Sequence, residues 1–435
     1  MKIISFLLTA GLTPVVLAVL VLTAARCLGA ERLGRGRRAL PLSLPTGPAG
    51  EGPRRWDTLR AAGWAVGALA LAWLASVLYV GIFAGPEVSA ETVGRAWQRY
   101  DAVHYLRLAS VGYQNNIEDG QHLTLVFFPL YPWLMRLLHL VIPSWAVCGH
   151  LLSGGCYVGA CCLFFRLTAG EFGRRAGFAA LAFLSAYPFA FFFASLHTES
   201  LFLLTSLACF TCIRKHRYPL AGLFGVLACL TRMQGAFLAF VALAEYCASQ
   251  RPFRKLRARD WRGLWRDLWG KLIWMPFMWL GTGCYLLLNY WVEGDPFRFL
   301  VYQREHWYQG LQWFTASLSG LLRAAISPSQ GYEFCTWTTW LPQFVLFFLC
   351  LALLIYSVRR LPPAWTVWCV VCIFLNYSLT NPLSCCRYIA CAFPLPVALA
   401  LLTRGRPGLE RGLLAASGVL QGVFLMAYLA GRHVC

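Results

Sequence analysis

The sequence predicts an all-α polytopic membrane protein, and two observations carry that prediction. The chain has 435 residues, of which 59% are hydrophobic and only 13% are charged. A soluble domain of this length could not cover so much apolar surface. Apolar runs, separated by arginine clusters and Gly/Pro corners, fill the chain almost from end to end. We therefore expect about 12 membrane helices in one membrane domain.

The formal net charge of +20 would suit a nucleic-acid partner if the basic residues formed one surface. They fall instead in short clusters between apolar segments, which is the signal that holds loops in the cytoplasm. No nucleic-acid partner is expected. The 18 cysteines show no Cys/His spacing typical of a metal site, so no metal is expected either. Pairing stays open among the cysteines expected to face outward: Cys335, Cys385, Cys386 and Cys435.

The first elements fix the orientation of the rest. The apolar run Ile3 to Ala25 is longer than a signal-peptide core and lacks a strongly basic leading region, so it is expected to be a helix. The arginines from Arg26 to Arg60 place the next segment in the cytoplasm. The run Ala61 to Ala84 then leads outward, which places residues 85–144 in a first outer loop.

Basic clusters mark the inner ends of the later crossings. If His122 to Ile142 crossed the membrane completely, Arg174 and Arg175 would lie outside, against the positive-inside rule. This Pro-interrupted segment is therefore expected to lie at, or dip into, the outer surface. A second outer loop is expected over 293–339. The remaining crossings are predicted at Trp145–Thr168, Gly177–Ala194, Leu201–Ile213, Leu220–Thr231, Ala236–Ala248, Leu272–Val292, Trp340–Val358, Ala364–Leu379, Tyr388–Leu402 and Leu413–Ala430.

Asp101 and His104 are the first candidate functional residues on the outer face. If a helix forms there, side chains three positions apart share one side, so the carboxylate and the imidazole can converge. Asp101 has an equally strong alternative reading as the N-cap of a helix beginning near Ala102. His104 is interpreted as an orienting or donor-binding residue.

Three further polar positions lie at the expected outer ends of helices. Glu199 belongs to the polar island Ala194 to Ser200, and a carboxylate at the membrane boundary is costly unless it is paired. Arg232 and Arg387 are single arginines opposite the basic clusters. The planar guanidinium suits phosphate oxygens, although an arginine that only reaches the interface is a common alternative.

Aromatic residues surround these positions. The segment Phe127 to Pro132 is typical of a bent interfacial helix, and the same bend can line a lipid-phosphate pocket. Aromatic rings of the second outer loop, Trp307 among them, can pack against sugar faces or simply form an interfacial belt. No phosphate loop and no dinucleotide fingerprint are present, which disfavours a nucleotide-sugar donor.

Six short motifs in the same order resemble those of the PIG-V family of mannosyltransferases, whose eukaryotic members add the second mannose of glycosylphosphatidylinositol anchors and which has many bacterial relatives. The match runs through most of Trp97 to Leu402. One departure is Tyr100, where the family usually has Trp. The motifs lie at Asp101–Tyr105, Gly112–Tyr113, Phe127–Pro132, Thr198–Ser200, Thr231–Gly235 and Arg387–Tyr388.

The resemblance implies a GT-C-type glycosyltransferase domain over 61–435, with 1–60 as an additional N-terminal helix and loop. It implies inverting transfer of a hexose, mannose in that family, from a polyprenyl-phosphate donor to a glycan, lipid or protein acceptor outside the membrane, without a cofactor. The membrane would be the bacterial cell membrane, or the endoplasmic reticulum in a eukaryote. A transporter or flippase of lipid-linked sugars is the alternative.

The same resemblance distributes roles among the candidate residues. Asp101 is expected to be the catalytic base. The donor phosphate would be bound by His104, Arg232, Arg387 and Tyr388. The sugar or acceptor site would contain Tyr105, Phe128, Tyr131, Glu199 and Trp307.

Overall fold

The computed structural model describes residues 2–29, 32–33, 40–41, 51–83 and 88–434. Much of the Arg-rich segment and Cys435 lie outside the described residues. Elements of the N-terminal half are α1 (Lys2–Cys27), β1 (Arg32–Leu33), β2 (Leu40–Pro41), α2 (Asp57–Phe83), α3 (Ala90–Ala96), α4 (Asp101–Val111), η2 (Leu123–Val126), α5 (Leu130–His139), α6 (Trp145–Phe172), α7 (Arg174–Ser185), η3 (Ala190–Ala194), α8 (Glu199–Arg214), α9 (Tyr218–Thr231), η4 (Met233–Phe237) and α10 (Leu238–Gln250).

The regular elements of the C-terminal half, among its described residues, are all helices. Its elements are α11 (Pro252–Arg257), α12 (Trp261–Asp267), η5 (Leu268–Leu272), α13 (Trp274–Phe277), α14 (Leu280–Glu293), α15 (Arg298–Glu305), α16 (Phe314–Ile326), η6 (Thr336–Trp340), α17 (Leu341–Ser357), α18 (Pro363–Tyr377), α19 (Cys385–Ile389), α20 (Pro394–Leu402) and α21 (Pro407–Leu429).

The predicted all-α class of a polytopic membrane protein is confirmed. The short antiparallel pair β1 and β2 is the only ladder among the described residues. Six helical stretches are long and apolar enough to cross a membrane; three shorter apolar helices accompany them, and the expected count of about 12 crossings stays a prediction. The six are Ile4–Cys27, Asp57–Phe83, Trp145–Phe172, Trp261–Glu293, Thr336–Ser357 and Pro407–Leu429.

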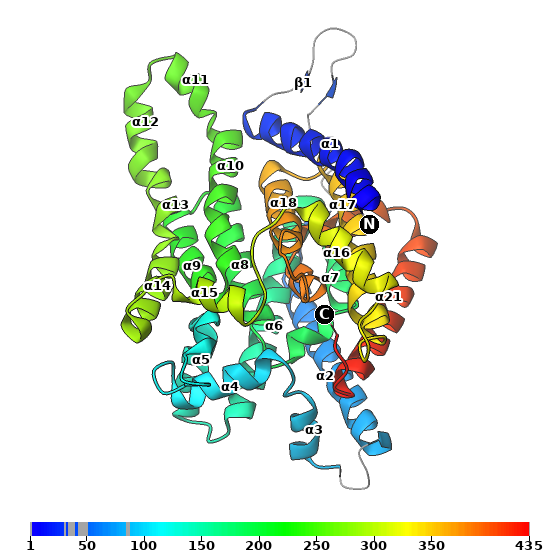
Figure 1. Ribbon diagram of the computed structural model, residues 1–435. Helices are drawn as coiled ribbons and strands as arrows, with labels where there is room; N and C mark the ends of the chain where they lie inside the picture. Colours follow the sequence, from blue (N-terminus) through cyan, green and yellow to red (C-terminus); the bar gives the residue numbers. More distant parts are fainter. Residues whose placement is uncertain (1, 30–31, 34–39, 42–50, 84–87, 435) are drawn as a thin grey trace.

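The two expected outer loops contain helices of their own. The segment 85–144 contains α3, α4, η2 and α5, and α5 has only 10 residues, far fewer than the ~20 that a crossing needs. The segment 293–339 contains α15 and the 13-residue α16, which packs against α1 and α17. Figure 1 shows α3, α4 and α5 at one end of the bundle and α11 and α12 at the other.

The crossing expected over Gly177–Ala194 differs from the observed structure. Helix α7 ends at Ser185, and the chain continues through Pro188 into η3. A proline has no backbone N–H to donate and clashes with the preceding turn, so it interrupts a helix. The break turns the polar island after Ala194 into a buried loop that leads into α8.

Two groups of charged side chains lie at the two ends of α8. At its C-terminal end, Arg214 donates to Glu171 of α6 (2.8 Å) and to Glu245 of α10 (2.5 Å). Glu199 begins the helix at the other end. Since α8 has 16 residues, it is ~24 Å long, shorter than the ~30 Å hydrocarbon layer. If Arg214 marks the inner boundary, as the positive-inside rule predicts, Glu199 is expected to lie below the outer one.

The core that holds these helices together is rich in aromatic side chains. Trp365 of α18 packs edge-on against Phe210 of α8, with ring centroids 4.8 Å apart, and Phe393 contacts both rings. All three are buried. Aromatic pairs of this geometry stabilise packing beyond their buried area. They fix α8 against α18 and α20, and so fix the helix that carries Glu199.

Candidate active site

Asp101 is the first residue of α4, and an unusual backbone conformation precedes it. Tyr100 has φ +53°, a region that non-glycine residues seldom adopt. Its ring packs on Tyr428 of α21, and its hydroxyl donates to the Arg432 carbonyl and accepts from the Val434 N–H. Tyr428 in turn donates to the Trp97 carbonyl (2.8 Å). The segment from Tyr428 to Val434 thus holds the turn before Asp101.

Asp101 does not act as the N-cap. The cap position belongs to Tyr100, without a side-chain cap bond, and the carboxylate is directed elsewhere. Its Oδ2 accepts from Nη2 of Arg387 at 2.6 Å. Oδ1 makes no such bond within the described part of the chain, and the side chain is 25% exposed, against 4% for Arg387. Asp101 therefore stands at the open edge of a buried ion pair.

Glu199 extends this pair into a chain of alternating charges. Its Oε1 lies 3.1 Å from Nε of Arg387 and also accepts from Nη2 of Arg232. Arg232 Nε donates to the Thr198 hydroxyl at 2.8 Å. The Glu199 side chain has no exposed surface, so its charge depends on both guanidinium groups. The order along the chain is Asp101, Arg387, Glu199, Arg232.

Tyr388 lies against both arginines. The guanidinium carbon of Arg232 is 4.8 Å from the centre of its ring, and that of Arg387 is 5.0 Å away. Such cation–π contacts stabilise a partly desolvated cation. Nη1 of each arginine has no acceptor among the described residues. Two donors therefore remain for an anionic ligand.

Gly235 explains how Arg232 reaches this position. After α9 the chain folds back into η4, and a Cβ on Gly235 would lie 2.4 Å from the carbonyl carbon of Ala228. Real Cβ atoms do not approach a backbone so closely, so only glycine fits this turn. The spacing from Thr231 to Gly235 thus has a steric basis.

The charge arrangement also sets the protonation of two groups. Desolvation would raise the pKa of Asp101, but the charge of Arg387 and its hydrogen bond lower this pKa by more, to below the usual value. Burial, followed by the charge of Arg387, lowers the pKa of His197 to about 4. Asp101 is therefore ionised and His197 neutral near pH 7.

His197 is a candidate that the sequence reasoning did not assign, although it belongs to the polar island. Ser195 Oγ donates to the Phe192 carbonyl at 2.7 Å, so it accepts from Nδ1 of His197 at 2.8 Å. This leaves Nε2 of His197 unprotonated, buried and without a partner among the described residues. The charges of Arg387, Glu199, Asp101 and Arg232 all act on its pKa.

An aromatic wall brings the second outer segment beside the first. His104 stacks on Phe127 with ring centroids 5.1 Å apart, and Trp307, just after α15, packs edge-on against both. Tyr105 packs edge-on against Phe127 from the buried side. His104 and Trp307 are half-buried, so they present partly open ring surface next to the turn that carries Asp101.

Phe128 and Tyr131 have a different placement. Phe128 stacks on Tyr285 of α14 at 4.0 Å. Tyr131 has no exposed surface, and its hydroxyl bonds the Gly149 carbonyl and Ser153 Oγ. Both residues pack α5 into the bundle and position the wall formed by His104, Phe127 and Trp307.

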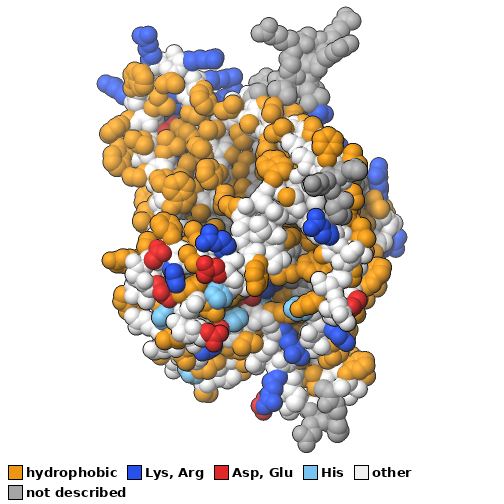
Figure 2. All heavy atoms as spheres, in the orientation of Figure 1, with side chains coloured by type: hydrophobic (Ala, Val, Ile, Leu, Met, Phe, Trp, Pro, Cys, Tyr) orange, Lys and Arg blue, Asp and Glu red, His pale blue; other side chains and the backbone are white. Residues whose placement is uncertain are grey.

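Acidic and histidine side chains gather on the lower left of the face shown in Figure 2, below an apolar surface, and basic side chains project from its upper end. Further basic side chains lie beside and below this patch. Glu293, the last residue of α14, accepts from His122 (2.8 Å) and Tyr302 (2.6 Å). This network joins α14 and α15 to the first outer segment.

Fold and site together define a helical integral membrane protein with a recessed acid and arginine site at one end. No family model matches the chain, and no curated protein matches it. Among solved structures it is similar to ArnT from Cupriavidus metallidurans bound to undecaprenyl phosphate, with TM-score 0.49 and 17% identity over 85% of this chain and 69% of that one.

Two archaeal structures are also similar. The Archaeoglobus fulgidus oligosaccharyltransferase in its apo form has TM-score 0.43 and 14% identity over 86% of this chain. AglB from the same organism, in complex with an inhibitory peptide and a dolichol-phosphate, has TM-score 0.40 and 12% identity over 88% of this chain. The chain spans 56% and 57% of these two proteins.

Proposed function

We propose that this protein is an inverting glycosyltransferase of GT-C type, similar to the PIG-V family. It moves a hexose from a polyprenyl-phosphate donor to an acceptor hydroxyl, and mannose is the first candidate for the sugar. The observation that carries the proposal is one partly open carboxylate, Asp101, beside two buried guanidinium groups. Each arginine keeps one Nη1 nitrogen for a phosphate. A base and a phosphate site thus lie together.

The reaction proceeds in one displacement. The acceptor hydroxyl attacks the anomeric carbon, and its proton passes to Asp101 Oδ1 as the new C–O bond forms. The bond from the anomeric carbon to the phosphate oxygen breaks, and its electron pair leaves with the polyprenyl phosphate. Arg232 and Arg387 stabilise that growing negative charge, a type of stabilisation that is often the largest single contribution to catalysis. Positioned general bases contribute typically ~10² to ~10⁴ in rate.

The other residues take positioning and binding roles. The sequence predicts Glu199 in the sugar or acceptor site. Because its side chain is completely buried between two guanidinium groups, a role in holding Arg232 and Arg387 in place is favoured. Tyr388 supports the same two groups. His104 and Trp307, with Tyr105 behind them, offer ring faces on which a sugar can pack.

Purified protein in detergent, given polyprenyl-phosphate mannose labelled in the sugar together with a membrane lipid extract, tests the proposal. Labelled product and released polyprenyl phosphate are expected in equal amounts. Asp101→Asn should abolish both, whereas Asp119→Asn, an exposed acid of the same outer segment, should not. Movement of intact donor across proteoliposome membranes, without any transfer, would instead identify a flippase.

A further inference from the structure

A cavity of about 890 Å³ lies between α2, α3 and the N-terminal half of α6, apart from the charged site. Ligand pockets commonly have volumes of ~300 to ~1,000 Å³. Its walls are mostly apolar, with Leu69 and Trp73 from α2 and Val147 and Leu151 from α6. Both helices are long and apolar enough to cross a membrane, so these walls suit contact with lipid chains.

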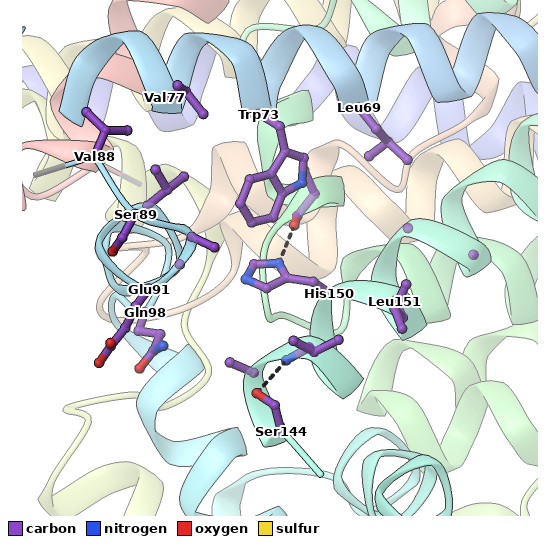
Figure 3. Close-up of a pocket in the computed structure, with 18 of the residues that line it drawn as sticks. Leu69, Trp73, Val77, Val88, Ser89, Glu91, Gln98, Ser144, His150 and Leu151 are labelled. Atoms are coloured by element: carbon purple, nitrogen blue, oxygen red, sulfur yellow. Dashed lines mark hydrogen bonds between the residues drawn. The ribbon is translucent and has the colours of Figure 1, made fainter. Parts of the chain in front are cut away.

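His150 of α6 places an imidazole within these walls. Figure 3 shows its imidazole between Trp73 and Ser144, reaching toward Ser89, Glu91 and Gln98 on the other side of the cavity. Nδ1 lies 3.1 Å from the Ala194 carbonyl. Since a carbonyl only accepts, Nδ1 carries the proton. In the neutral ring Nε2 is then an acceptor, and it has no partner within the described part of the chain.

The charges of the residues that line the cavity disfavour a phosphate headgroup. Glu91 is the only charged side chain among the described residues that line the cavity, and it pairs with Arg95. Ser89, Gln98 and Ser144 supply neutral polar groups on the α3 side. A phosphate would meet an acceptor nitrogen and a carboxylate here, with no cation of the lining to offset its charge. A hydroxyl group instead donates to Nε2 without electrostatic cost.

The cavity and the charged site share structural elements. Trp97 packs against Trp73 and His150 from the buried side and precedes Asp101 in the same turn. The carbonyl that holds His150 belongs to Ala194, next to the loop that carries His197 and Glu199. A ligand in the cavity therefore contacts elements that position Asp101 and Glu199.

From these observations we infer that the cavity binds a neutral lipid, with its hydrocarbon chains along α2 and α6 and a headgroup hydroxyl donating to His150 Nε2. Resting on the proposed function, this lipid is the acceptor, and a second hydroxyl of its headgroup, not the one held by His150, is the nucleophile that loses its proton to Asp101. The donor, which carries a phosphate, uses Arg232 and Arg387 instead.

Photo-crosslinking of the full chain in nanodiscs tests the binding. Three diazirine-bearing probes are compared: a dialkylglycerol, its 3-O-methyl ether, in which a methyl group replaces the donating hydrogen, and the corresponding dialkyl phosphatidic acid. Mass spectrometry should locate the dialkylglycerol on peptides of α2 and α6 that line the cavity. One hydrogen bond predicts labelling about 3- to 10-fold above the ether. Equal labelling by all three probes would mean bulk membrane lipid only, and stronger labelling by phosphatidic acid would overturn the neutral headgroup.

Two variants distinguish the contribution of the lipid's hydrocarbon chains to binding from that of its headgroup hydroxyl. A Cβ on Gly155 of α6 meets open space in the cavity, so Gly155→Phe should fill it and reduce labelling by both neutral probes. Gly170→Phe, also in open space on α6 but outside the cavity, is the matched control. His150→Phe keeps a ring and should make the alcohol and the ether label equally. A preference for the alcohol that survives in His150→Phe would remove His150 from the site.

Transfer assays with the same variants test the acceptor role. Gly155→Phe should lose transfer to lipid while still releasing sugar from the donor to water. Full lipid transfer in that variant would refute the acceptor role. If the wild-type protein neither transfers nor hydrolyses, the proposed function fails, while the crosslinking pattern still decides whether the cavity binds a neutral lipid.

Discussion

Replacing Asp101 with asparagine separates its proposed catalytic role from its structural one. Asparagine has nearly the same size and keeps an oxygen that accepts from Arg387. Arg387 also keeps Glu199 at 3.1 Å. Removing one partner of a fully buried pair costs ~3 to ~5 kcal/mol, but the Asp101 side chain is 25% exposed and the hydrogen bond persists, so we expect a loss of ~1 to ~2 kcal/mol.

The expected effect on rate is much larger. Loss of a general base lowers turnover by ~10² to ~10⁴, which is ~3 to ~5 kcal/mol of barrier. Initial rates of sugar transfer and thermal unfolding are measured on the same purified preparations, with Asp119→Asn as the control. Turnover within about threefold of wild type would refute the role of Asp101 as base, since that role alone predicts at least ~10². The base would then have to be sought at His197.

Two further predictions concern the same charges, and a third concerns the topology. Arg232→Gln leaves buried Glu199 with one guanidinium, so thermal unfolding should shift to lower temperature and donor binding should weaken. Arg232→Lys should recover part of the binding, and Glu199→Gln added to Arg232→Gln should restore part of the stability. An unchanged melting temperature of Arg232→Gln would contradict the ion-pair chain. Because folding lowers the pKa of Asp101, its ion pair with Arg387 stabilises the folded state above pH ~4, and this contribution is lost as the pH falls through the lower pKa of the folded state. The difference in melting temperature between wild type and Asp101→Asn should be constant from pH 5 to 8 and shrink in stronger acid. A difference that stays constant in stronger acid would count against the ion pair. In a cysteine-free background, Asp101→Cys should be labelled from outside and Arg257→Cys only after permeabilisation; outside labelling of the latter would reverse the topology.

Periodicity and charge in the sequence predict the long helices well, because their apolar runs and basic boundaries are local signals. The ends of α8 illustrate this, since Glu199 and Arg214 already mark polar boundaries in the sequence. The break of α7 was missed, although Pro188 is its local cause. Helix α16 was missed because its 13 residues are short for a crossing and were assigned to an outer loop.

The site shows where local reasoning ends. Asp101, Glu199, Arg232 and Arg387 were each singled out as polar groups near the outer ends of helices. Their order of pairing was not predictable, because the bond between Asp101 and Arg387 joins residues 286 positions apart. The unprotonated Nε2 of His197 and the cavity beside His150 depend on hydrogen bonds to neighbouring loops. Sequence spacing contains no signal for either.

The attachment of Tyr100 to the segment from Tyr428 to Val434 has a consequence for how the protein matures during synthesis. The bond from Tyr100 to Arg432 spans 332 positions. Contacts of such long sequence separation form late, after most of the chain has left the ribosome and its helices have been inserted. A nascent chain halted before Tyr428 would contain Asp101 but lack the segment from Tyr428 to Val434, which holds the turn before Asp101. On the proposed function, sugar transfer should therefore begin only after α21 has docked.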